Sequence, residues 1–209
     1  MTRKRSSRRH LGLATALLVV AGTAMLMPAP AMAAVESYKI DAEHTAVSFS
    51  VRHFFSKVPG RFTTFEGAIL LDETDFTLGS VNFNIEAASI DTNEPARDRH
   101  LRSDAFFDAE NHPKITFTST NVRAVDETHL KVDGDLTIRG TTKKVTLDVE
   151  VLGFGELYSV RRAAFEAKLT IDRTDYGVSW NDVAEAGGAI LGTDVNILIN
   201  LEAKLQKTD

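Results

Sequence analysis

The chain has 209 residues, no cysteine and a formal net charge of −5 at neutral pH. Residues 1–33 hold five of the 24 lysine and arginine residues and none of the 29 acidic residues, so the rest of the chain is strongly acidic. Such a surface repels nucleic acid and anionic lipid headgroups, which require clustered positive charge. The absence of cysteine excludes thiol catalysis, thiolate zinc sites and iron–sulfur clusters. We therefore predict no nucleic-acid partner.

The first 33 residues predict an export signal. A basic stretch, TRKRSSRRH, precedes an apolar run at 11–27, and Ala-Met-Ala at 31–33 supplies the pattern that signal peptidase recognises. We expect residues 1–33 to be a cleaved signal peptide and residues 34–209 to be one periplasmic or secreted domain without an integral membrane segment. The arginine pair at 8–9 also resembles a twin-arginine signal, but such pairs are common in basic leaders, so the export route stays open.

Most of the remaining chain alternates apolar and polar residues with a period of two. This alternation is typical of antiparallel strands that are buried on one face and wetted on the other. It is clearest at 45–53, 80–87, 144–151, 164–172 and 194–205, and weaker strands begin at 67, 114 and 129.

The count is therefore about eight strands, and no long helix alternates with them. We predict an all-β fold, an eight-stranded antiparallel barrel, because closing a meander edge to edge removes its exposed sheet edges. A sandwich is the second choice.

One polar stretch, NEPARDRHLR, interrupts the strands and predicts a short helix near residues 93–103. A residue at 91–93 can cap it, and Asp98 and Arg102 are spaced for an ion pair along its surface. Because Leu101 is almost its only apolar residue, core burial alone cannot hold this helix in place. It is either loosely attached, or its polar groups bond to something specific.

No motif in the chain predicts catalysis or a metal site. GVSWN at 177–181 lacks the second glycine of a nucleophile elbow, and GFGELY at 153–158 lacks the third glycine of a dinucleotide fingerprint. His44 and His53 fall on opposite faces of a regular strand, and zinc-protease and EF-hand patterns are absent from the sequence. We predict a non-enzyme with no catalytic residue, no metal and no cofactor.

Four blocks of the sequence resemble the YceI-like family of exported bacterial proteins. They are DAEHTAVSFSVRHFFSKVPGRF, SIDTNEPARDRHLRSDAFFDAENHPKITFTST, DGDLTIRGTTKKVTLDV and GGAILGTDVNILINLEAKL, in this order. The resemblance implies a lipocalin-like barrel with a short helical segment. It also implies non-enzymatic binding of a long-chain isoprenoid, such as a quinone or a prenyl phosphate, or of another amphiphilic lipid, for periplasmic transport, storage or sequestration.

The resemblance and the strand pattern together indicate candidate ligand-binding residues. An apolar bore suits a prenyl tail, at about 25 cal/mol per Å2 of apolar surface removed from water, whereas the head needs polar groups at the mouth. For the wall we expect Phe49, Val51, Phe62, Phe83, Ile85, Phe106, Phe117 and Trp180. For the head group we expect Arg52, His53, Arg97, His100 and Arg102.

Simpler interpretations of these residues stay open. The aromatic residues could just fill the core, and Arg97 and Asp98 could form a salt bridge that fastens the helix across the barrel mouth. Phe106 and Phe107 would plug the interior beneath that helix. A lipid-modifying enzyme and an interaction module for a membrane electron-transfer protein are the alternative functions, and a homodimer is left open.

Overall fold

The computed structural model describes residues 35–181 and 190–206, and the expected signal peptide therefore lies outside the described residues. Within these ranges the chain is built from strands, one short α-helix and three 3-10 turns. The strands are β1 (Glu36–Ile40), β2 (Ala46–His53), β3 (Ser56–Phe62), β4 (Phe65–Leu71), β5 (Ser80–Glu86), β6 (Ile90–Asp91), β7 (Lys114–Ala124), β8 (His129–Ile138), β9 (Thr141–Leu157), β10 (Val160–Asp172) and β11 (Leu191–Leu205). The helix is α1 (Pro95–Arg102), and the 3-10 turns are η1 (Phe76–Leu78), η2 (Ala87–Ser89) and η3 (Arg173–Tyr176).

Three of the barrel strands are interrupted. β1 and β2 both pair with β11 in the same antiparallel sense, so they act as one broken strand. The next broken strand consists of β3, which pairs with β2, and β4, which pairs with β1. The third consists of β6, which pairs with β3, and β5, which pairs with β4. With each broken pair counted once, the described sheet has eight antiparallel strands, and the pairing of β1 with β11 closes it. The predicted eight-stranded barrel is confirmed.

Alternation along each strand builds the interior. In β8 the buried positions alternate strictly with partly exposed ones, from Leu130 through Val132, Gly134 and Leu136 to Ile138. Each pleat therefore sends every second side chain toward the barrel axis, as a period of two requires. Apolar residues of all the long strands meet there in two adjoining clusters.

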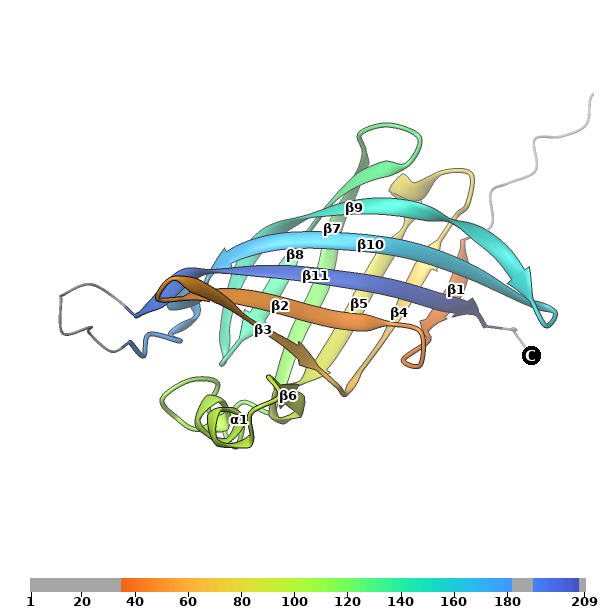
Figure 1. Ribbon diagram of the computed structural model, residues 1–209. Coiled ribbons are helices and arrows are strands. Elements are labelled where there is room, and N and C mark those ends of the chain that lie inside the picture. Colours follow the sequence, from red (N-terminus) through yellow and green to blue (C-terminus); the bar gives the residue numbers. More distant parts are fainter. Residues whose placement is uncertain (1–34, 182–189, 207–209) are drawn as a thin grey trace, which may run out of the picture. The chain divides into compact units, whose positions relative to one another are not determined.

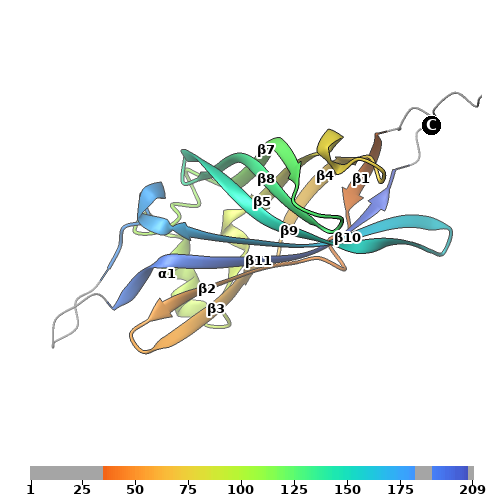
Figure 2. The ribbon, with the colours of Figure 1, turned by 90° about the horizontal axis from the view of Figure 1, so that it is seen from above.

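The barrel has two different ends (Figure 1). At one end, called here the helix end, lie α1, η3, the β2–β3 turn and the start of β11. At the other, called the far end, lie the β9–β10 turn and the end of β11. α1 stays at the helix end in the view from above as well (Figure 2). No helix of the described residues is long and apolar enough to cross a membrane.

The helix forms where the sequence predicts it, but its polar contacts differ from the prediction. The N-cap is Glu94, whose side chain accepts a hydrogen bond from the backbone N–H of Ala96, so a cap at 91–93 is wrong. The expected surface pair of Asp98 with Arg102 is also wrong. Asp98 is only 6% exposed and faces inward, because its carboxylate accepts two hydrogen bonds from Thr92.

Candidate functional site

The barrel encloses an apolar cavity of about 610 Å3. All eight residues that the sequence suggested for the wall lie in its lining, together with Phe107 and Leu101. The volume falls in the usual range for pockets that hold one small ligand. The interior is thus hollow, although the core interpretation of the aromatics is partly right too, since Phe62, Phe83 and Phe106 are buried. Contact of these residues with a ligand stays a prediction.

Two glycines keep aromatic rings against the wall. Phe49 on β2 lies directly opposite Gly60 on β3, and a Cβ at position 60 would overlap the ring. Phe117 on β7 pairs with Leu136 on β8, and its ring lies diagonally over Gly134, where a Cβ would overlap it. Because each ring occupies the space of the missing side chain, it does not project toward the axis, and the cavity stays open.

An aromatic cluster closes the helix end from inside. The ring centroids of His100, Phe106 and Trp180 lie 5.0 to 5.2 Å from one another. Beside them Phe107 packs edge-on against Phe62, with centroids 5.9 Å apart. Edge-to-face contacts of this kind hold rings in fixed orientations. Trp180 is half-buried and His100 is exposed, so this part of the lining borders solvent.

The structure divides the five residues expected at the head group. His53, Arg97 and His100 are exposed and line the cavity, from β2 and α1. Arg52 and Arg102 do not belong to the lining. Arg52 points away because it alternates with the inward residues of β2, and Arg102 donates to the carbonyl oxygens of Ala88 and Ile90 at 2.6 and 2.8 Å.

Thr92 connects Arg97 to Asp98 without a direct ion pair. Arg97 donates from Nε to the Thr92 hydroxyl at 2.7 Å and from Nη2 to the Thr92 carbonyl oxygen at 2.8 Å. The same hydroxyl donates to Asp98. These bonds fasten the start of α1 to the segment after β6, while Nη1 of Arg97 has no hydrogen-bond partner among the described residues.

Arg173 is a lining residue that the sequence did not reveal. It is 5% exposed, and its guanidinium donates to the carbonyl oxygens of Gly192, Val178 and Trp180 at 2.5 to 2.9 Å. Within the described ranges no carboxylate forms an ion pair with it. Burial lowers the pKa of this guanidinium, but arginine stays protonated at neutral pH. No sequence motif marks an arginine that binds backbone carbonyls in this way.

The cavity lining has basic side chains but no carboxylate. The basic residues are Lys168 and, at the helix end, His53, Arg97, His100 and Arg173, and no aspartate or glutamate of the described residues lines the cavity. This is notable in a chain with more acidic than basic residues. Without a carboxylate the described lining offers no carboxylate pair of the kind that glycosidases use.

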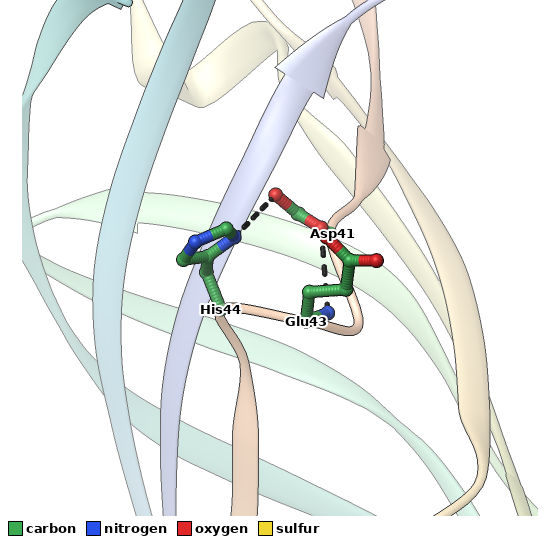
Figure 3. A group of neighbouring side chains, drawn as sticks. All are labelled: Asp41, Glu43 and His44. Carbon is green, nitrogen blue, oxygen red and sulfur yellow. Dashed lines mark hydrogen bonds and ion pairs between the residues drawn. The ribbon is translucent and has the colours of Figure 1, made fainter.

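One group of potential metal ligands among the described residues does not belong to the cavity lining. Asp41, Glu43 and His44 could each offer one ligand atom (Figure 3). The Asp41 carboxylate, however, already bonds His44 at 2.8 Å, Arg162 at 2.9 Å and Lys204 at 2.7 Å. Two of these neighbours are permanent cations that repel a metal ion, so the geometry is that of an ion-pair network.

Burial raises the pKa of the Asp41 carboxyl, but hydrogen bonds from Lys204, His44 and Arg162 outweigh that effect and hold it well below the usual range. Asp41 directly follows β1, and Lys204 lies on β11, next to the pairing that closes the barrel. The network therefore stabilises the closure of the sheet.

A closed eight-stranded antiparallel barrel with an apolar cavity and a short helix at one end defines a lipocalin-like barrel protein. This chain belongs to the YceI-like domain family, whose model matches residues 38–203. It is 37% identical over 188 residues to Protein YceI of Escherichia coli O157:H7, covering 88% of this chain and 95% of that one. It is 36% identical over 197 residues to a UPF0312 protein of Photorhabdus laumondii, covering 92% and 98%.

Two solved structures share the fold. Burkholderia cenocepacia BcnA superposes with a TM-score of 0.70 at 24% identity, over 78% of this chain and 98% of that one. A polyisoprenoid binding domain from Saccharophagus degradans superposes with a TM-score of 0.63 at 17% identity, over 83% and 100%. At these identities the likeness establishes the barrel architecture.

Proposed function

We propose that this protein binds one long-chain amphiphile without transforming it, with the apolar tail in the barrel and an anionic head at the helix end. An isoprenoid phosphate has this chemistry. One observation carries the proposal: the apolar cavity is lined at the helix end by basic side chains and by no carboxylate of the described residues. The Saccharophagus barrel, a polyisoprenoid binding domain, supports the choice of an isoprenoid.

The tail is recognised by burial alone. An isoprenoid chain offers only apolar surface, and its removal from water contributes about 25 cal/mol per Å2. Phe49 and Phe117 lie flat over their glycines, so the wall gives the tail a smooth apolar surface. Because the hydrophobic effect is non-directional, the wall selects the tail only by its width and length. Chemical specificity must then come from the residues that contact the head group.

The head is recognised by hydrogen-bond donors of basic residues. His53, Arg97 and His100 are exposed lining residues at the helix end, and Nη1 of Arg97 is available to an anionic oxygen. Arg173 adds a buried positive charge beneath them. Charge-assisted bonds to phosphate are roughly twice as strong as neutral ones, so this arrangement favours a phosphate over the neutral head of a quinone.

The place of action follows from the same proposal. An exported carrier of this kind would transport, store or sequester its lipid in the periplasm or outside the cell, in agreement with the export signal that the sequence predicts. The protein needs no cofactor for this role, because binding alone is the function.

Lipid extraction tests the proposal. The protein purified from a bacterial host is extracted with organic solvent, and mass spectrometry should find a stoichiometric isoprenoid with a phosphate head. The variant Arg97→Gln/His100→Gln should retain about a tenth of that lipid or less, because it loses charge-assisted bonds at the head. Arg99→Gln, an exposed arginine of α1 outside the lining, is the matched control. An empty barrel from several hosts would contradict the proposal.

A further inference from the structure

The turn between β2 and β3 exposes two phenylalanines. The hairpin tip, defined here as residues 53–56, has Phe54 and Phe55 as its two central residues. Phe55 is 91% exposed and Phe54 44%, and their ring centroids lie 3.9 Å apart. Two large apolar side chains thus stand together in water at the point of the hairpin that is farthest from the core.

Folding does not explain these two residues. Phe54 has a φ of 52°, in the left-handed region, where glycine or asparagine fits a two-residue hairpin turn and a bulky residue is strained. Phe55, at 91% exposed, gains almost no burial, and Phe54 still leaves 44% of its surface exposed. An unfavourable residue retained at an exposed site indicates a role in function rather than in stability.

The tip holds its rings in place. The backbone N–H of Phe54 donates to the carbonyl oxygen of Ile190 at 2.7 Å, and Arg52 donates to the carbonyl oxygen of Phe54 at 3.3 Å. The hydroxyl of Ser56 donates to the carbonyl oxygen of His53, also at 3.3 Å. The rings are therefore presented on a hydrogen-bonded turn, which lowers the entropy lost when they bind.

The hairpin tip borders the cavity. His53 and its cross-strand partner Leu191 both line the cavity, and Phe54 follows His53 directly. Arg52 and Lys57 face each other across the hairpin just behind the rings, and neither forms an ion pair with a described residue. In Figure 1 this turn lies at the helix end, far from the β9–β10 turn.

We propose that the hairpin tip inserts Phe54 and Phe55 into a lipid bilayer and so docks the helix end of the barrel on a membrane. Aromatic rings followed by basic side chains are the composition of membrane-surface anchors, with the rings at headgroup depth and the cations near lipid phosphates. The rings supply the attraction, because the chain as a whole is acidic. This docking goes beyond cargo binding and does not depend on what the cavity holds.

The small apolar area of the hairpin tip favours a bilayer over a protein partner. Two phenylalanines offer about 150–250 Å2 each, whereas a specific interface buries about 800 Å2 on each partner. A bilayer needs no complementary surface, so a small apolar tip suffices for reversible attachment.

The far end supplies a matched control. Tyr158, in the β9–β10 turn, is 89% exposed and has a φ of 51°, so it is a similar aromatic at a similar turn. Ser56 and Ser159 lie beside the two aromatic sites and are both exposed. Because the chain contains no cysteine, a cysteine at either serine can carry a single environment-sensitive fluorophore.

The experiment combines flotation with fluorescence on phosphatidylcholine vesicles, using variants that share one N-terminus. A fluorophore at Ser56→Cys should shift to the blue and be shielded from an aqueous quencher, while one at Ser159→Cys should not change. The variant Phe54→Ser/Phe55→Ser should lose vesicle binding about tenfold or more, and Tyr158→Ser should bind like the parent chain.

Three results would overturn the proposal: equal flotation of the double phenylalanine variant and the parent, attachment only to membranes that contain protein, or dimerisation that depends on the two rings without vesicle binding. Lipid extraction distinguishes membrane docking from lipid binding in the cavity. The variant Phe54→Ser/Phe55→Ser should lose vesicle binding but should still purify with the lipid in its cavity.

Discussion

At the scale of single residues, Gly60 and Gly134 decide how much room the cavity has. Each lies under an aromatic ring of the neighbouring strand, where any Cβ would overlap the ring. A ring that is displaced from the wall can move only toward the axis, because the barrel wall blocks the other direction. A methyl group added at either glycine would therefore reduce the cavity by the volume of the displaced ring, which is much larger than the methyl group itself.

The substitution Gly60→Ala should reduce lipid binding strongly while leaving the barrel folded. The three atoms nearest to a Cβ at position 60 all belong to the ring of Phe49, so this ring must leave the wall, and such overpacking costs typically about 1–3 kcal/mol of unfolding free energy. The measurements are lipid content by mass spectrometry and urea unfolding. Gly155→Ala is the control, because a Cβ there meets no atom within 4 Å. Adding Phe49→Leu to Gly60→Ala should restore binding; if lipid content never fell, the ring does not limit the cavity.

The sequence pattern predicted the residues of the cavity wall better than those expected at the head group. Alternation tells which way a strand residue points, and this was enough to place Phe49, Val51 and their counterparts in the lining. The same alternation argues against Arg52, which the resemblance had suggested beside His53. Arg173 could not be predicted, because it bonds the carbonyl oxygens of Val178 and Trp180, which follow η3, and of Gly192 on β11, and these meet only in the folded chain.

At the scale of elements, α1 is held by polar bonds in place of apolar burial. Its ties run through Asp98, Arg97 and Arg102 to Thr92 and to the carbonyl oxygens near β6. The sequence correctly showed that Leu101 alone could not anchor this helix. It could not show the partner, since Thr92 precedes the helix and its role depends on the bend between β6 and α1.

Replacing Asp98 by alanine should loosen α1. The buried backbone N–H and hydroxyl of Thr92 would lose their acceptor, at a cost of about 1–3 kcal/mol, whereas Asp98→Asn keeps an acceptor oxygen and should cost less. Urea unfolding gives the stability, and hydrogen exchange of residues 90–103 should quicken in the alanine variant. Asp104→Ala, an exposed carboxylate after the helix, should change neither; exchange unaltered by Asp98→Ala would refute the anchoring role.

At the scale of the whole molecule, closure of the barrel depends on charge. Asp41 bonds Arg162 of β10 and Lys204 of β11, beside the short pairing of β1 with β11. Periodicity predicted antiparallel strands and favoured the closed barrel over a sandwich, because closing the meander edge to edge removes both exposed edges. It could not predict the breaks in three strands or the ion pairs at the closure, which depend on residues far apart in sequence.

Stability should fall in acid because of Asp41. Its pKa is depressed in the folded chain, so its contribution is fully present above the ordinary carboxyl pKa of about 4 and is lost as pH falls below that value toward the folded pKa. Urea unfolding between pH 7 and strong acid should show this loss, and Asp41→Asn should flatten the acid limb of the curve. Glu43→Gln, its exposed neighbour, should leave the curve unchanged; an unaltered limb in Asp41→Asn would refute the role.

The ring-on-glycine arrangement also fixes an order of change between two positions of this chain. Phe49 and Gly60 sit on different strands, yet they occupy one shared volume. A side chain at position 60 requires a smaller neighbour at position 49, whereas a smaller residue at 49 requires no change at 60. The ring must therefore shrink before the glycine can be replaced without strain.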